Sequence, residues 1–159
     1  QENIFLAASS GRQIEIYQSV KRRISTLDEA GLQIFNQVDI DNQKLLNLIT
    51  ILLLDDLFTE FMTEVYSENL RKGNMQLSSI DYRSFFTEKQ RSSEAVSQWK
   101  EYTVKRLISA YQTYLLETGL LRSEENGYRI TPILLDKRIM QWLVEKNRKD
   151  IVLALGGSL

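Results

Sequence analysis

The sequence contains no cysteine and no histidine. Without thiolates or imidazoles, disulfides, the common zinc sites and nucleophiles activated by a histidine base are all excluded. These absences remove most classes of enzyme, and we predict a non-catalytic protein that has no metal and no cofactor. The lack of cysteine also fits the reducing cytoplasm, where we expect the protein to act.

Proline and glycine are scarce, with one proline and seven glycines among 159 residues. This composition leaves little room for linkers or disorder. Long apolar runs are missing as well, because the most apolar stretch, Leu45 to Leu54, is about ten residues long, whereas a spanning helix needs about twenty. We therefore predict a core helix at this stretch and no membrane association.

The formal net charge is −1, but the charges are unevenly distributed. Residues 1–97 contain ten Lys and Arg against fourteen Asp and Glu, whereas residues 98–149 contain ten against six. The C-terminal third is therefore the basic part of the chain, which favours an anionic partner.

Apolar residues recur at steps of three and four along most of the chain, a spacing that predicts a mainly helical, all-α fold. The first stripe consists of Ile14, Tyr17, Val20, Ile24 and Leu27. Asp28 is expected to cap a short helix that runs through Phe35, and Asp41 to cap the core helix. Asp55, with Asp56, is expected to cap a further helix that ends near Gly73.

The polar stretch Glu88–Ser93 is the best candidate for a boundary between two parts of the chain. Before it, Gly73–Leu77 is predicted to be a loop that leads into a short helix starting at Ser78 or Ser79. We predict an N-terminal helical bundle over residues 1–90 and a C-terminal helix–hairpin–helix unit over residues 91–159. The two could also form one domain.

The C-terminal unit begins with a long amphipathic helix that starts at Trp99 and ends at Gly119, a residue suited to the left-handed conformation that terminates helices. Its predicted buried face consists of Trp99, Tyr102, Leu107, Ile108, Tyr111, Tyr114 and Leu115.

A hairpin is predicted next, because Leu120–Arg122 and Tyr128–Ile130 flank Asn126-Gly127, a pair that favours tight turns between strands. Thr131 then fits as a helix N-cap and Pro132 as the first helical residue. The apolar stripe of that last helix is Leu135, Ile139, Trp142 and Leu143.

A helix followed by a hairpin that carries Arg122 and Arg129 is the layout of a winged helix, although a hairpin between two helices can also be a plain connection. If the helices fold side by side, the basic residues from Lys100 to Arg138 could form one surface that contacts phosphates, and a continuous positive band joining this region to the helix of Arg12 to Arg23 would support binding. The candidate nucleic-acid-binding residues are Arg12, Lys21, Arg22, Arg23, Lys100, Lys105, Arg106, Arg122, Arg129, Lys137 and Arg138.

Several stretches, taken in order and spacing, resemble the BrxA proteins of BREX bacteriophage-exclusion systems. They are Glu2–Leu6, the helix of Arg23 with Ser25–Leu27, Leu45–Val65, Phe85-Phe86, Trp99, Leu116–Leu121 and Ile130–Leu135. The resemblance implies a helical bundle similar to the antitermination factor NusB. It also implies a non-catalytic subunit that binds double-stranded DNA and assembles with other BREX subunits.

Two other functions remain open at this point. The charged faces could be merely solvated on a protein that serves as an interaction scaffold. A fold similar to NusB could also bind RNA, and competition between duplex DNA and structured RNA would separate these functions.

Overall fold

The computed structural model describes residues 9–125 and 127–158. The stretch Glu2–Leu6, which carries part of the family resemblance, and the predicted turn residue Asn126 lie outside the described residues. The helices are α1 (Ser10–Ile24), α2 (Glu29–Phe35), α3 (Ile40–Leu52), α4 (Asp56–Phe61), the π-helical segment η1 (Met62–Tyr66), α5 (Ser67–Arg71), α6 (Ser79–Ser92), α7 (Glu94–Ser97), α8 (Glu101–Thr118), α9 (Lys137–Glu145) and α10 (Lys149–Ala154). The strands are β1 (Gln76–Leu77), β2 (Leu121–Glu124) and β3 (Gly127–Ile130). The prediction of a mainly helical fold with a short hairpin is confirmed.

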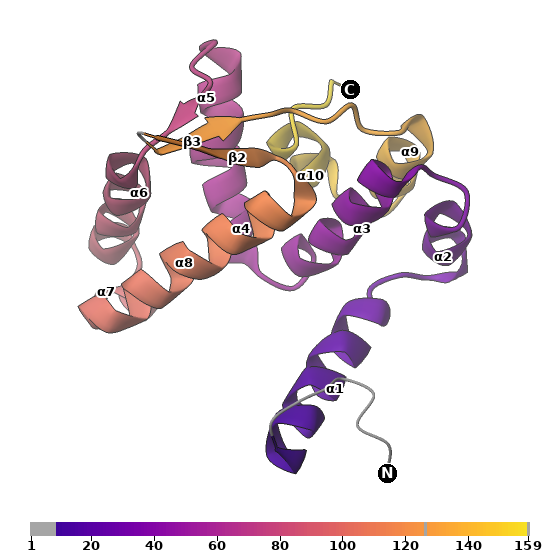
Figure 1. The fold of residues 1–159 in the computed structure, drawn as a ribbon, viewed down its shortest axis with the longest axis horizontal. Helices are drawn as coiled ribbons and strands as arrows, with labels where there is room; N and C mark the ends of the chain where they lie inside the picture. Colours follow the sequence, from indigo (N-terminus) through magenta and orange to yellow (C-terminus); the bar gives the residue numbers. More distant parts are fainter. Residues whose placement is uncertain (1–8, 126, 159) are drawn as a thin grey trace.

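Helix α1 extends away from the rest of the molecule (Figure 1). It begins at Ser9, whose side chain accepts a hydrogen bond from the Arg12 backbone N–H, and it contains no buried residue. The predicted apolar stripe is present on this helix but faces solvent for most of its length. The next helix, α2, begins at Asp28 as predicted, because the Asp28 carboxylate accepts a hydrogen bond from the Gly31 N–H.

Helix α3 is the buried helix predicted from the apolar run, but its start differs from the prediction. Asp39, rather than Asp41, is the N-cap, because its extended backbone lets the carboxylate accept a hydrogen bond from the Asn42 N–H at 2.9 Å. Asp41 instead lies in the first turn and pairs with Lys44 at 3.6 Å. The buried residues of α3 are Asn42, Leu45, Leu46, Leu48, Ile49, Thr50, Ile51 and Leu52.

A second continuous helical stretch runs through α4, η1 and α5. Asp55 caps it as predicted, with its carboxylate accepting a hydrogen bond from the Phe58 N–H. The stretch ends before Gly73, which has a φ of 71°, a left-handed conformation that favours glycine. The π-helical segment in its middle packs against α10, so the C-terminal end of the chain lies on this helix.

Helix α6 runs through most of Glu88–Ser93, the polar stretch proposed as a boundary. The helix begins after Ser78, which forms a reciprocal cap with Asp81, and it continues to Ser92. Glu88 and Arg91 are exposed on this helix, whereas Phe85 and Phe86 are buried, and Lys89 pairs with Glu60 and Glu64 of the preceding helical stretch. Residues on both sides of this stretch belong to one hydrophobic cluster, which extends from Val38 to Leu155.

The hairpin of β2 and β3 is confirmed, and it belongs to a three-stranded antiparallel sheet in the order β1-β3-β2. Strand β1 lies in the segment predicted to be a loop, where Gln76 and Leu77 are aligned with Arg129 and Tyr128. A two-residue strand has no detectable alternation in sequence, so only its pairing with β3 defines it.

The last helix does not start at Thr131 and Pro132. The Thr131 N–H donates a hydrogen bond to the Leu120 carbonyl and its hydroxyl donates to the Gly119 carbonyl, so this residue is tied to the base of the hairpin. Residues 131–136 are not helical, and α9 begins at Lys137 with Asp136 as its N-cap. The predicted stripe of Leu135, Ile139, Trp142 and Leu143 is buried, and α10 adds Ile151, Val152 and Ala154 to the core.

Candidate nucleic-acid interface

Residues 56–130 form a helix, strand, helix, helix and hairpin in that order, with the short α7 between the last two main helices. The first strand, β1, pairs with the last strand, β3, and β2 lies at the other edge of the sheet. This is the connectivity of a winged helix-turn-helix unit, in which α4–α5, α6 and α8 are the three helices (Figure 1). We call residues 56–130 the winged unit.

Buried aromatic rings fix α8 against the other two helices of the winged unit. The ring of Tyr111 on α8 stacks on Phe58 of α4 with the ring centroids 4.3 Å apart, and it lies 5.9 Å from Phe86 of α6. Phe61 of α4 in turn stacks on Tyr82 of α6 at 4.9 Å. Offset stacking of this kind adds to the energy of burial, so the orientation of α8 is set by its inner face.

The outer face of α8 is polar and open to solvent. Because a helix turns once every 3.6 residues, Tyr102, Lys105, Arg106, Ser109 and Thr113 share one side, and all five are exposed. Tyr102 was predicted to be buried, but 71% of it is exposed. It lies in the first turn of α8, before the helix reaches the core, and its ring lies 6.0 Å from the Arg106 guanidinium.

The basic side chains of α8 form only weak interactions with other residues of the chain. The Lys105 ammonium lies 2.7 Å from the Glu101 carboxylate, but more than two thirds of each side chain is exposed. The hydrogen bond from Lys105 lowers the pKa of Glu101. Exposed ion pairs contribute little free energy and are screened by salt, so a phosphate group can replace Glu101 as the partner of Lys105 at small cost.

Two arginines face each other across the hairpin. Arg122 of β2 and Arg129 of β3 are directly opposite in the register, and directly opposite residues project from the same face of a sheet. Both are exposed, and the third residue of this row is Gln76 on β1. Like charges in this arrangement destabilise a hairpin. The Glu124 carboxylate lies 3.9 Å from the Arg129 guanidinium, and both side chains of this pair are exposed.

A cleft of about 620 Å³ separates α6 from α8. Arg83 of α6 and Lys105 of α8 both line it, together with Ser79, Glu101 and Ser109 among its polar residues. Arg83 and Arg91 were not among the candidates from the sequence, although both are exposed on α6. The helical periodicity of the sequence could have identified them, because it places both arginines away from the side that carries Phe85 and Phe86.

The basic residues of α1 form a separate group. Arg12 lies 3.0 Å from Glu15, and Lys21, Arg22 and Arg23 occupy the last turn of the helix. The Arg23 guanidinium lies 5.8 Å from the Tyr114 ring of α8, so this residue connects α1 to the winged unit.

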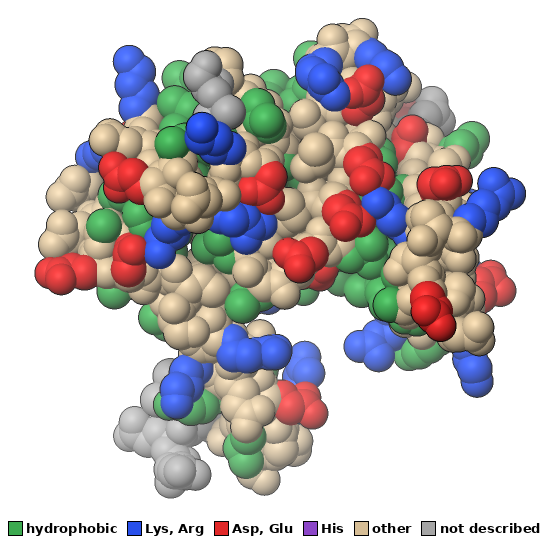
Figure 2. All heavy atoms as spheres, turned by 180° about the vertical axis from the view of Figure 1, so that it is seen from behind, with side chains coloured by type: hydrophobic (Ala, Val, Ile, Leu, Met, Phe, Trp, Pro, Cys, Tyr) green, Lys and Arg blue, Asp and Glu red, His purple; other side chains and the backbone are tan. Residues whose placement is uncertain are grey.

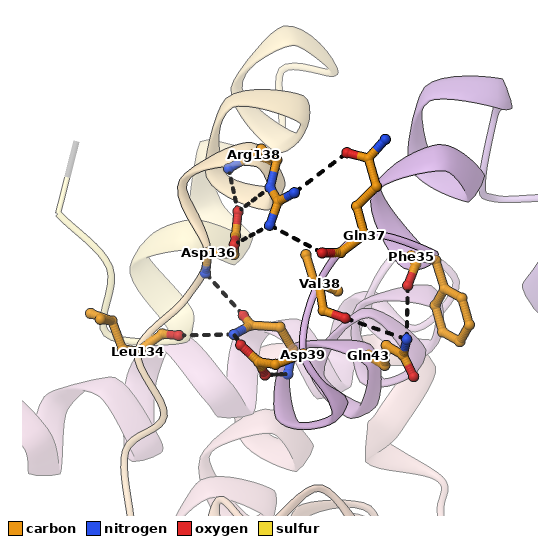
Figure 3. Close-up of polar contacts among 9 residues, drawn as sticks. Phe35, Gln37, Val38, Asp39, Gln43, Leu134, Asp136 and Arg138 are labelled. Atoms are coloured by element: carbon orange, nitrogen blue, oxygen red, sulfur yellow. Dashed lines mark hydrogen bonds and ion pairs between the residues drawn. The ribbon is translucent and has the colours of Figure 1, made fainter.

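Arg138 and Lys137 lie at the start of α9, outside the winged unit. The Arg138 guanidinium donates hydrogen bonds to both oxygens of Asp136 at 2.8–2.9 Å and reaches the backbone carbonyl of Gln37 (Figure 3). This ion pair lowers the pKa of Asp136 to about 2. Arg138 therefore holds the α2–α3 connection against the start of α9, whereas Lys137 is exposed.

The eleven candidates lie on three parts of the fold. The winged unit contains Lys100, Lys105, Arg106, Arg122 and Arg129; α1 contains Arg12, Lys21, Arg22 and Arg23; α9 contains Lys137 and Arg138. On the face shown in Figure 2, basic and acidic side chains alternate over the body of the molecule. Within the described part of the chain, no three acidic residues gather as they would around a metal ion, and no helix has the length and apolar character to cross a membrane.

The sequence matches the model of the BrxA family over residues 1–147. It is also similar to a BREX protein BrxA of Bacillus cereus (strain H3081.97), with 34% identity over 140 residues. That match covers 88% of this chain and 70% of the Bacillus protein.

Proposed function

The chain belongs to the BrxA family, and on this premise we propose that it is a non-catalytic subunit of a BREX phage-defence system that binds double-stranded DNA through its winged unit. Its further partners would be other BREX subunits, and it would act in the cytoplasm. The absence of cysteine and histidine supports a binding role over a catalytic one.

The observation that carries this proposal is the pair of Arg122 and Arg129 on the hairpin. Two directly opposed arginines on an exposed sheet face cost free energy in the isolated protein, and an anion between them removes that cost. Phosphates of a DNA backbone are spaced regularly along each strand, so a hairpin of this kind is suited to lie along the backbone.

The position of α8 gives the hairpin its context. In a helix-turn-helix, the second helix lies in the major groove and the elements around it contact phosphates. Helix α8 occupies that position in the winged unit, with Tyr102, Arg106 and Ser109 on its outer face. Lys105 and Arg83 on the two sides of the cleft would contact the flanking phosphates.

This geometry predicts DNA binding that depends strongly on salt. Contacts from lysine and arginine to phosphates release counterions, and they carry no information on sequence. The outer face of α8 presents few side chains that form bidentate contacts with bases, so we expect modest sequence preference.

Fluorescence anisotropy with a labelled duplex of two helical turns, measured over a series of salt concentrations, tests the proposal. We expect the wild-type protein to bind at low salt and the double variant R122A/R129A to bind more weakly. Its plot of log K against log salt should be shallower by roughly 1 for each lost phosphate contact. The matched control K137A/K149A removes the same charge from exposed positions on α9 and α10.

Equal affinity and equal salt dependence of R122A/R129A and the wild type would contradict the role of the hairpin. Absence of binding at low salt would contradict DNA binding altogether. Unlabelled structured RNA and unlabelled duplex DNA are then used as competitors. Stronger competition by the RNA would replace this proposal with RNA binding, as for a protein similar to NusB.

A further inference from the structure

Helix α1 presents its apolar side to solvent. Ile14, Tyr17 and Ile24 are 57%, 55% and 53% exposed, and no residue of the helix is buried. An amphipathic helix normally buries such a stripe against the core. A row of exposed apolar side chains of this kind is a candidate surface for binding another molecule.

The stripe continues into a groove of about 520 Å³ between α1, α2 and α3. Its walls are mainly apolar, with Val20 and Ile24 from α1, Leu32 and Phe35 from α2, and Ile40 from α3. Ile40 is 63% exposed and Leu32 is 44% exposed, so the walls of the groove are accessible. Three helices and the α1 stripe together form an elongated apolar site.

The charged residues that line this groove are both basic. Arg23 and Lys44 line it, and no carboxylate does so among the described residues. Asp41 lies beside the groove and pairs with Lys44 at 3.6 Å, but 46% of the Lys44 side chain and 61% of the Asp41 side chain are exposed. Such an exposed pair contributes little free energy, so Lys44 can exchange Asp41 for another carboxylate.

We propose that this groove binds an amphipathic helix of a partner protein whose polar side is acidic. An apolar groove between helices accepts the apolar face of another helix, and Arg23 and Lys44 in its lining would pair with Asp and Glu beside that face. A second copy of this chain fits less well, since its own α1 would bring Lys21, Arg22 and Arg23 to a groove whose charged lining residues are already basic.

The test uses two synthetic amphipathic helical peptides with identical leucine faces, one with glutamate and one with lysine on the polar face. Each is labelled and titrated with the full 159-residue chain by fluorescence anisotropy. We expect the glutamate peptide to bind and the lysine peptide to bind at least tenfold more weakly. The variant K44E should weaken binding of the glutamate peptide and strengthen binding of the lysine peptide.

The variant I24E/I40E places carboxylates on both walls, at positions that are already more than half exposed, so folding should be retained. It should reduce affinity for the glutamate peptide at least tenfold. The matched control is L54E/L134E, which adds the same two carboxylates at apolar residues that are 51% and 90% exposed and lie outside the groove, and it should bind like the wild type.

Three results would overturn the proposal: equal binding of the two peptides, unchanged affinity in I24E/I40E, or a dimer of the wild-type chain that I24E/I40E converts to a monomer. The last would assign the groove to a second copy. Binding of I24E/I40E to duplex DNA should equal that of the wild type, because the groove lies outside the winged unit. A failure of DNA binding and a failure of this proposal are therefore distinguishable.

Discussion

The carboxylate of Asp28 accepts a hydrogen bond from the indole N–H of Trp142 at 2.9 Å, across 114 positions of sequence. The same carboxylate caps α2 through the Gly31 N–H and lies 2.8 Å from the ammonium group of Lys146. One side chain thus caps the start of α2 and joins this helix to α9. Because Trp142 belongs to the buried stripe of α9, this link connects the exposed N-terminal helices to the hydrophobic core.

Replacing Asp28 should lower the free energy of unfolding. We expect D28A to lose about 1 kcal/mol, because it removes the N-cap of α2, and D28N to lose less, because asparagine caps helices nearly as well. Urea denaturation followed by circular dichroism measures both. Equal losses in D28A and D28N would show that the ion pair with Lys146, rather than the cap, is the main contribution of Asp28.

The contribution of Asp28 should depend on pH. Its pKa is lowered from 3.8 to about 2, first by the hydrogen bond from Lys146 and then by those from Gly31 and Trp142. A carboxyl group whose pKa is lower in the folded state stabilises the protein above its unfolded pKa, and the stabilisation is lost as the pH falls toward the folded pKa. The difference in unfolding free energy between the wild type and D28N should therefore shrink as the pH falls from about 4 to about 2. A constant difference over this interval would contradict the shift.

Gly31 and Gly11 should respond to alanine in opposite ways, although both are in helices. A Cβ at Gly31 would lie 3.0 Å from the Trp142 ring and 3.3 Å from Leu27, so G31A should cost about 1–3 kcal/mol through overpacking. A Cβ at Gly11 would have no neighbour within 4 Å, so G11A should leave stability unchanged or increase helix content slightly. Thermal unfolding and helical circular dichroism compare the two. Displacement of the Trp142 indole N–H resonance in G31A, but not in G11A, would identify the cause.

The Tyr111 hydroxyl is buried, and it has no hydrogen-bond partner among the described residues. Burial raises the pKa of Tyr111, as expected for a phenol far from water. Removing an unsatisfied buried polar group relieves its desolvation cost, so Y111F should be neutral or more stable by about 1 kcal/mol. A clear loss of stability in urea denaturation would indicate that the hydroxyl has a partner, such as an internal water.

Charge reversal on α8 should strongly weaken DNA binding at low salt while leaving the fold intact. K105E/R106E places two carboxylates on the exposed face of the helix, and the expected loss of affinity is more than tenfold. The matched variant K137E/K149E makes the same change of charge on α9 and α10. A similar loss in both variants would indicate nonspecific attraction to the whole protein rather than binding by the winged unit.

Local patterns in the sequence were sufficient to predict most of the helices. The spacing of apolar residues, the caps at Asp28 and Asp55, and the glycines at 73 and 119 acted through groups a few positions away, and all are confirmed. The predicted start of the last helix was wrong, because Thr131 donates its hydrogen bonds to the carbonyls of Gly119 and Leu120 at the other end of the hairpin. Such contacts have no signature within a local window.

The sequence predicted which residues belong to the candidate site, but not how they are arranged in space. The sequence identified Lys105, Arg106, Arg122 and Arg129 as basic residues near a hairpin, and the family resemblance is confirmed by the match over residues 1–147. It could not reveal that β1 pairs with β3, that Arg83 shares a cleft with Lys105, or that Arg138 is held by Asp136 and Gln37. These contacts depend on which surfaces of the helices and strands pack together, and that packing is determined by side chains far apart in the sequence.

The sequence by itself determined the helical class, the absence of cysteine and histidine chemistry, the hairpin and the family. The tertiary structure alone decided which apolar stripes are buried. The stripes of α1 and α9 look alike in sequence, yet Ile139, Trp142 and Leu143 are buried while Ile14, Tyr17 and Ile24 face solvent. Periodicity shows that a helix has an apolar side, but burial requires a complementary surface from another part of the chain, and among the described residues α1 has none along most of its length.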